Sequence, residues 1–149
     1  MEYNRQEISA DDYQRMLDGF CNTGHNGELG LIHHGTGEDW LEYRLPWKED
    51  LVGEPGSGRI ATSVIYSLLD SSGALLPFFV LKRMVPYPTL EFRVDHYRQP
   101  QPRKDVIVRG ISAKLTPDIS FVRGIAHEGD PEDPIAVGNG TFMSVKQLK

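Results

Sequence analysis

The sequence has a single cysteine, no excess of basic residues and no uninterrupted apolar run long enough to cross a membrane. Because Cys21 is alone, an intrachain disulfide and a cysteine-rich metal site are excluded, which suits a reducing cytoplasm. A formal net charge of -5 argues against a broad basic surface for nucleic acid. The apolar run from Gly73 to Leu81 is interrupted by Pro77 and falls far short of the roughly 20 residues of a membrane span. The opening stretch MEYNRQEISADD is too polar for a secretory signal. We therefore expect a cytoplasmic protein without nucleic-acid or membrane partners.

The length and composition are those of one folded domain. The chain has 149 residues, of which 39% are hydrophobic and 25% charged. A domain of this length buries about 68 to 70% of its unfolded surface, which is enough for one well-packed core. We expect a single domain over residues 1–149, in which about residues 1–25 form an N-terminal helical extension.

Hydrophobic periodicity predicts the order of helices and strands. Ser9 is a good helix cap, and the apolar spacing from Tyr13 to Phe20 predicts a short amphipathic helix that Gly24 and Gly27 break. Further along, the pattern predicts a hairpin with strands at 29–33 and 40–45, a loop at 51–58, a helix from about 60 to 76 ended by Pro77, and strands at 89–97, 106–112, 119–127 and 135–145. The expected fold is α+β, with one antiparallel sheet covered by one long helix.

The long helix carries two different faces. Its apolar face recurs at spacings of three, four and seven residues and is suited to pack on a sheet. The other face consists of Ser63, Tyr66, Ser67, Asp70, Gly73 and Ala74. These residues are small or weakly polar, unlike the lysine and glutamate surface of a solvated helix. The pattern therefore predicts that this face also meets protein, such as a second subunit.

Asp70 is a carboxylate on this second face and has several possible roles. It can be a solvated surface group, or a buried group paired with an arginine such as Arg93 or Arg59. It can also serve as a general acid or base, since Gly56-Ser57-Gly58 leads into the helix and the free N–H groups of the first turn can polarise a carbonyl. The pattern alone leaves these alternatives open.

Three segments of the sequence are LVGEPGSGRIATSVIYSLLDSSGAL, TLEFRVDHYRQP and IAVGNGTFM. Together they resemble the hotdog-fold acyl-CoA thioesterases of the phenylacetic-acid-degradation (PaaI-like) type. LVGEPGSGRIATSVIYSLLDSSGAL resembles the loop and central helix G-N-P-x-x-G-x-x-H-G-G with its later L-L-D. TLEFRVDHYRQP resembles the strand T-L-D-x-R-x-D-Y-x-R-P, and IAVGNGTFM resembles the closing strand V-A-x-A-x-G-T-F. The similarity runs from about residue 29 to residue 143, and the segments keep the family's order and spacing.

The resemblance implies a hotdog fold, in which a long central helix is wrapped by the sheet, and a homodimer or dimer of dimers (a homotetramer) with active sites at the subunit interface. It implies hydrolysis of a small or medium acyl- or aryl-CoA thioester without a metal or redox cofactor, the coenzyme A being part of the substrate. By the same resemblance, Asp70 is the general base or the nucleophile, the N–H of Thr62 or Ser63 polarises the thioester carbonyl, and Thr89 positions the water or the substrate.

One departure from the family pattern opens a second possibility. Ala61-Thr62-Ser63 stands where the family has His-Gly-Gly, so the imidazole and the space left by two glycines are lost while a backbone N–H remains. The alternative function is a non-catalytic hotdog protein that binds acyl-CoA or serves in assembly. A hotdog dehydratase or hydratase is a weaker alternative, because no histidine accompanies Asp70 on its helix. The acyl group, and the choice between coenzyme A and acyl-carrier protein, are left open.

Basic and histidine side chains give weaker signals. Adjacent His33 and His34 on a strand point to opposite faces, which argues against a metal site. Positive residues are frequent in the later strands, where a cluster can hold the phosphates of coenzyme A or simply form salt bridges on solvated faces. For a coenzyme A site we select Arg59, Lys114 and Arg123. The run from Pro77 to Leu81 either lines an acyl pocket or completes the core.

Overall fold

The computed structural model describes residues 9–82, 85–116 and 118–145. Residues 1–8 of the predicted N-terminal extension, and Pro117 between two predicted strands, lie outside the described residues. The elements follow in the order α1 (Ala10–Asn22), α2 (Gly24–Leu29), β1 (Ile32–Thr36), β2 (Trp40–Leu45), the 3-10 helix η1 (Glu49–Leu51), α3 (Thr62–Leu81), β3 (Thr89–His96), β4 (Val106–Leu115), β5 (Ile119–His127) and β6 (Ala136–Met143).

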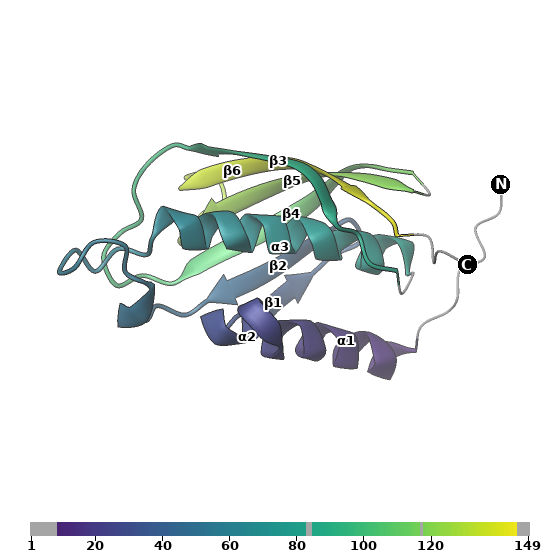
Figure 1. Cartoon of the computed structure of the whole chain (residues 1–149), viewed down its shortest axis with the longest axis horizontal. Coiled ribbons are helices and arrows are strands. Elements are labelled where there is room, and N and C mark those ends of the chain that lie inside the picture. Colours follow the sequence, from purple (N-terminus) through teal and green to yellow (C-terminus); the bar gives the residue numbers. More distant parts are fainter. Residues whose placement is uncertain (1–8, 83–84, 117, 146–149) are drawn as a thin grey trace.

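The six strands form one antiparallel sheet in the order β1-β2-β4-β5-β6-β3. The long helix α3 runs along one face of this sheet, while α1 and α2 lie beside the β1 edge (Figure 1). The fold is therefore α+β with one antiparallel sheet and one long helix on it, as the sequence pattern predicts. Ser9 caps α1 by accepting a hydrogen bond from the Asp12 N–H.

The core lies between α3 and the sheet. Ile65, Leu69 and Leu76 of α3 are completely buried there. Glycines on the strands allow this close approach: a Cβ atom added at Gly124 would lie 2.8 Å from Leu69 Cδ2, and one added at Gly110 would lie 3.2 Å from the Ser72 carbonyl oxygen. Gly110 and Gly124 therefore face α3, and the residues next to them on β4 and β5 face away from it.

Two predicted boundaries are wrong for physical reasons. The helix does not end at Pro77 but continues to Leu81, because only the one hydrogen bond that a Pro77 N–H would donate is lost and the flanking turns are packed against the core. Helix α1 ends before Gly24, as predicted, but Gly24–Leu29 then forms a second helix that the pattern does not predict. That helix ends with Gly30 in the left-handed conformation (φ 79°), so the first strand begins later than predicted.

Helix α3 is long and apolar enough, by length and composition, to cross a membrane. Half of its most apolar window is buried inside the protein, and the core helix of a folded domain meets the same criteria. Its packing against the sheet accounts for its apolar composition.

Strand β3 forms one edge of the sheet and pairs only with β6. Two hydrogen bonds extend this pairing beyond the ends of β3: the Met143 N–H donates to the Pro88 carbonyl, and the Tyr97 N–H donates to the Ile135 carbonyl. The Pro88 carbonyl and the Tyr97 N–H therefore point toward β6. Because hydrogen-bonding direction alternates along an antiparallel strand, the backbone groups of Phe92 and Val94 face away from β6. This outward-facing edge of β3 runs beside α3, on the side of the helix that carries Asp70.

Candidate active site on helix α3

Asp70 lies on the side of α3 that faces the edge strand β3. Its side chain is half-buried, and its Oδ1 accepts a hydrogen bond of 2.8 Å from the Thr89 hydroxyl at the start of β3. The structure thus brings together two of the residues selected from the sequence. A single donor on Oδ1 fixes the orientation of the carboxylate and leaves Oδ2 able to accept a proton from another molecule.

The arginine pairings considered for Asp70 are not seen. The Arg93 guanidinium contacts Asp95, with Nη2 at 2.9 Å from Oδ1, and Arg59 donates to the Pro100 carbonyl. Within the described parts of the chain, no lysine, arginine or histidine nitrogen lies within 4.0 Å of the Asp70 carboxylate. Asp70 is therefore neither in an ion pair there nor fully exposed.

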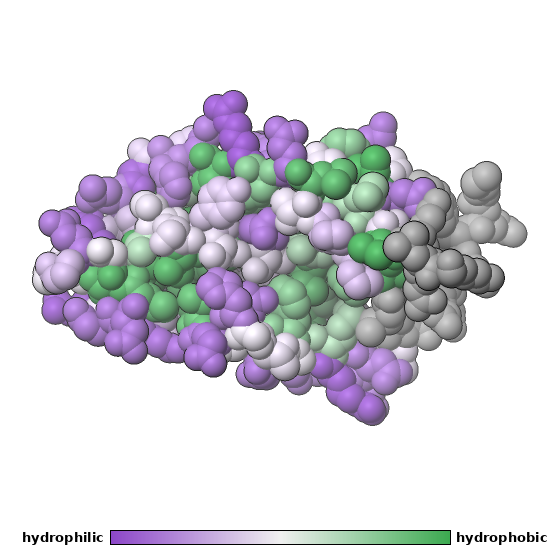
Figure 2. All heavy atoms as spheres, in the orientation of Figure 1, coloured by the Kyte–Doolittle hydropathy of each residue, from purple (hydrophilic) through white to green (hydrophobic). Residues whose placement is uncertain are grey.

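The helix face around Asp70 has the predicted weakly polar character. Ser63, Ser67 and Ala74 are small, and Tyr66 is the large side chain among them. Figure 2 shows pale, weakly polar atoms along the middle of the molecule over α3, bordered by hydrophilic groups at the rim. From Ser63 to Asp70 this face is at least partly uncovered in a single chain. Gly73, which the sequence pattern places on it, is instead buried, and a Cβ atom there would lie 2.3 Å from the Phe142 ring.

The amino end of α3 offers backbone donors. Its N-cap residue, Ala61, has no side chain that can cap the helix, and its carbonyl accepts from the Val64 and Ile65 N–H groups. The N–H groups of Thr62 and Ser63 have no acceptor among the described residues, and both residues are exposed. Two free donors at the positive end of a 20-residue helix are suited to a partly negative oxygen.

A cavity of about 380 Å³ adjoins this helix end. We call it the N-terminal cavity, and its lining residues are Gly53, Glu54, Ser57, Arg59, Ile60, Ala61, Thr62, Gln99 and Pro100. The loop beneath it is held in place, because the Gly58 carbonyl accepts from the Trp47 indole N–H at 2.8 Å and from the Arg103 N–H at 2.8 Å. The N-terminal cavity therefore brings together Arg59 and Thr62, two more residues selected from the sequence.

Asp70 is not close to the donors of its own helix. An α-helix rises 1.5 Å per residue, so Thr62 and Asp70 are about 12 Å apart along the axis. For attack, the water oxygen must lie about 3 to 3.5 Å from the thioester carbon. A water held by Asp70 is too far from a thioester whose carbonyl oxygen is held by the Thr62 N–H of the same chain. The expectation that Asp70 acts at the amino end of its own helix is therefore wrong.

Lys114 and Arg123 lie apart from both groups. Arg123 precedes Gly124, which faces α3, so its side chain is on the opposite face of the sheet. Lys114 is paired with Phe121 across a β-bulge and shares that opposite face. In one chain, these two cations and Arg59 therefore do not form a cluster.

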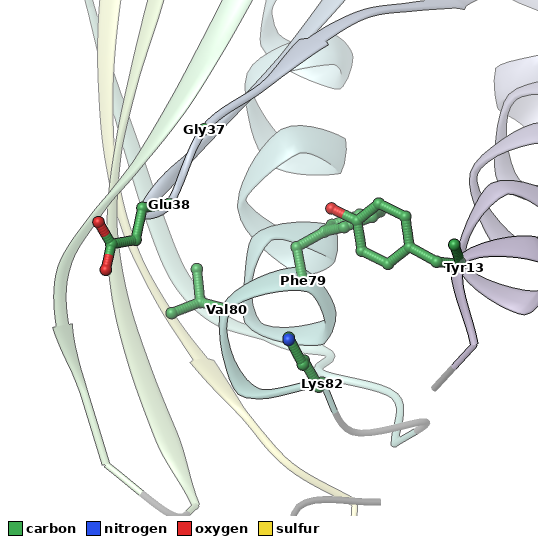
Figure 3. A pocket seen from close by; sticks show the side chains of 7 residues that line it. Tyr13, Gly37, Glu38, Phe79, Val80 and Lys82 are labelled. Carbon is green, nitrogen blue, oxygen red and sulfur yellow. The ribbon is translucent and has the colours of Figure 1, made fainter. Parts of the chain in front are cut away.

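A second cavity, of about 640 Å³, lies at the other end of α3 (Figure 3). Tyr13 and Phe79 meet edge to face there, with ring centroids 4.6 Å apart, and the Lys82 side chain is close by. Burial raises the pKa of Tyr13. Phe79 is buried in the core, as one of the two interpretations of the run from Pro77 to Leu81 has it, and it also lines this cavity. Nine residues separate it from Asp70, about 13 Å along the axis.

A buried charged cluster occupies the sheet face away from α3. Glu42 Oε1 accepts from Arg109 Nε at 2.8 Å and lies 3.6 Å from His127 Nε2, which is too far for a hydrogen bond. His127 is 3% exposed, and its Nδ1 accepts from the Gly129 N–H. Burial lowers the pKa of His127, and this effect exceeds the opposing attraction of Glu42.

We expect stability to fall on acidification because of His127. Below a pH of about 6.5, this histidine is protonated in the unfolded chain to a greater extent than in the folded chain. The unfolded state therefore binds more protons, and the free energy of unfolding decreases as the pH falls. Burial also lowers the pKa of His33, which acts in the same direction. Thermal unfolding of the wild type and of His127→Asn, followed from neutral pH downward, should show a smaller pH dependence in the variant. An equal dependence in both would contradict this assignment.

The fold is similar to that of solved thioesterase-superfamily proteins. A thioesterase of Haemophilus influenzae superposes with a TM-score of 0.79 at 19% identity, over 97% of this chain and 96% of that one. A Shewanella oneidensis protein related to the thioesterase superfamily gives a TM-score of 0.76 at 21% identity, over 91% and 97% of the two chains. The fold, a six-stranded antiparallel sheet with a long helix against it, is the hotdog fold of these proteins.

A closer sequence match comes from Pseudomonas aeruginosa. A protein of that organism is 32% identical, with a TM-score of 0.79 over 89% of this chain and 98% of the other. This chain belongs to the same family as that protein, within a fold whose structural neighbours are thioesterase-superfamily proteins. The sequence matches no protein-family model and has no significant match among curated proteins.

One residue of this region is missed by the sequence-based selection. Tyr66 donates a hydrogen bond of 3.0 Å to the Phe92 carbonyl, and its ring meets the Phe92 ring edge to face. Its place on the same helical face as Asp70, one turn earlier, was the available signal. The partner could not be identified from sequence, because it is an outward carbonyl of an edge strand.

Proposed function

We propose that the protein is a thioester hydrolase that cleaves small or medium acyl- or aryl-CoA thioesters, with two copies of the chain forming each site. The observation that carries the proposal is the Asp70 carboxylate on α3, which is half-buried, is held by the Thr89 hydroxyl and has no cationic partner among the residues that the structure describes. Structural neighbours named as thioesterases support the reaction class. The PaaI-like type is part of the proposal.

The donor for the carbonyl oxygen comes from a second copy. Helix α3 lies beside the outward edge of β3, and the backbone groups of Val94 on that edge have no strand opposite them within the described chain. Edge strands of this kind pair readily with another strand. If two copies join β3 to β3 about a two-fold axis, their α3 helices run antiparallel, and Asp70 of one copy approaches the amino end of the other helix.

The reaction then follows from the groups present. The Asp70 carboxylate accepts a proton from a water molecule, and the water oxygen forms a bond to the thioester carbon. The carbonyl oxygen becomes an oxyanion that accepts hydrogen bonds from the Thr62 and Ser63 N–H groups of the other copy. When the carbon–sulfur bond breaks, the electron pair leaves with sulfur and the proton on Asp70 passes to it. The products are a carboxylic acid and free coenzyme A.

The N-terminal cavity is suited to the coenzyme A end of the substrate. Arg59 supplies a positive charge at this cavity, which adjoins the positive end of α3. Lys114 and Arg123 lie on the face of the sheet away from α3 and are not among the residues that line this cavity. We therefore propose Arg59 as the main phosphate contact.

The test is release of free coenzyme A from a panel of acyl-CoA and acyl-carrier-protein thioesters, followed with a thiol reagent. The protein adds little background, because burial raises the pKa of its one thiol, Cys21, to about 11. Turnover of at least one thioester supports the proposal. Tight binding without turnover would favour the acyl-CoA-binding alternative. That alternative is suggested by Ala61-Thr62-Ser63, which stands where the family has His-Gly-Gly. Loss of enoyl-CoA absorbance without thiol release would indicate a hydratase.

A further inference from the structure

Tyr66 has an unusual position on the uncovered face of α3. It is 42% exposed although its hydroxyl donates to the Phe92 carbonyl and its ring lies against the Phe92 ring, with centroids 5.5 Å apart. The two contacts hold one side of the ring against β3 and leave the other side open. Its neighbours on this face, Ser63 and Ser67, are small. The tyrosine ring is therefore the largest obstacle along this stretch of the helix surface.

The position of Tyr66 relative to the two proposed site groups is symmetric. It lies four residues after Thr62 and four residues before Asp70, so each is about 6 Å away along the axis. If Asp70 of one copy works with Thr62 of another on an antiparallel helix, residue 66 is the midpoint of the pairing. The Tyr66 rings of the two copies then lie near the two-fold axis, between the two active sites.

The direction of the substrate follows from the N-terminal cavity. This cavity lies beyond Thr62, on the side away from Tyr66. A thioester with its carbonyl oxygen on the Thr62 N–H and its coenzyme A in the N-terminal cavity points its acyl group the other way, toward Tyr66. The wall of the acyl site nearest the axis is therefore the open side of this ring.

We infer that Tyr66 determines specificity by limiting the length of the acyl group, so that the enzyme favours short or compact acyl groups over long straight chains. The inference rests on the proposed function and deepens it. The hydroxyl bond to Phe92 keeps the ring in place, and the volume of the ring sets the limit. An acyl group that fits can pack on the ring, whereas a longer chain requires the ring to move and its contacts with β3 to break.

The experiment compares kcat/KM for butanoyl-CoA and decanoyl-CoA in the wild type, Tyr66→Ala, Tyr66→Trp and Tyr66→Phe. Removing the ring should raise the decanoyl-to-butanoyl ratio by about 10-fold or more, since a few methylene groups in an apolar pocket are worth at least that. The larger indole should lower the ratio, and Tyr66→Phe should keep the wild-type ratio because the ring volume is retained. Tyr97→Ala removes a tyrosine that is 62% exposed outside the site, and should also keep it.

Binding separates this inference from the proposed function. Dissociation constants for butyl-CoA and decyl-CoA thioethers, which cannot be hydrolysed, report the same pocket without turnover. A wild type that hydrolyses no thioester but shows the expected shift in Tyr66→Ala would overturn the proposed function and support the acyl-length limit. Two results would overturn the acyl-length limit, whether or not the protein is a hydrolase. One is a ratio of the two dissociation constants that is the same in the wild type, Tyr66→Ala and Tyr66→Trp. The other is failure of the wild type to bind either thioether.

Discussion

Replacing Asp70 with asparagine is expected to lower kcat for thioester hydrolysis by about 10²- to 10⁴-fold, the usual contribution of a positioned general base. Asparagine keeps the size of the side chain and an oxygen that can accept from Thr89, so the local structure should be preserved. It cannot accept a proton from water. Because only the chemical step is affected, KM should change much less than kcat. Thiol release under saturating substrate measures the effect.

Asp95→Asn is the matched control. Asp95 is another half-buried aspartate, on β3, but its side chain is on the face of the sheet away from α3, it is paired with Arg93 and it has no place in the proposed reaction. The control should hydrolyse at close to the wild-type rate, with thermal unfolding showing that both variants are folded. Equal kcat values for the wild type and Asp70→Asn would remove Asp70 from the mechanism.

Thr62→Pro should lower kcat by about 10²- to 10³-fold, as expected for the loss of one donor to an oxyanion. Proline lacks the backbone N–H, and residue 62 is the first residue of α3, where proline is well tolerated. The preceding Ala61 is already extended (φ -60°, ψ 140°), the conformation that a following proline requires. The substitution therefore removes the donor without breaking the helix.

Thr62→Ala separates the backbone donor from the side chain. It removes the hydroxyl and keeps the N–H, so it should retain most of the activity that Thr62→Pro loses. Initial rates at saturating substrate and circular dichroism of both variants give the comparison. A Thr62→Ala enzyme as slow as Thr62→Pro would show that the hydroxyl is the important group, and the backbone assignment would then be wrong.

Most of the fold follows from local sequence patterns. The capping Ser9, the alternation along the four later strands and the apolar face of α3 each predict an element at nearly its observed position. Local patterns failed where tertiary packing decided the outcome. Pro77 stays inside the helix because the turns on either side of it are buried, and the second helix at 24–29 depends on Gly30 adopting a left-handed end.

Less of the candidate site could be predicted. The helical pattern singled out Asp70, the family resemblance supplied its role and the choice of Thr89, and the structure brings the two residues into hydrogen-bond contact. Lys114 and Arg123 were selected for their charge and for their place on either side of a turn. The face of the sheet on which Lys114 lies depends on a β-bulge that the sequence does not predict. The role of Tyr66 depends on which carbonyls of β3 face outward, which is a property of strand order. Sequence periodicity predicts on which face of a helix or strand a residue lies, but the order of the neighbouring strands determines what that residue contacts.

The central claim is that Asp70 of one copy works with the helix donors of another, and mixing two inactive variants tests it most directly. Asp70→Asn and Thr62→Pro chains are unfolded together, refolded as a mixture and assayed against each variant refolded alone. In a mixed dimer, one site combines an intact Asp70 with an intact Thr62 N–H, so random mixing should restore about a quarter of the wild-type activity. If the mixture is no more active than the separate variants, although mass spectrometry detects mixed dimers, the two groups do not meet across an interface and the account is contradicted.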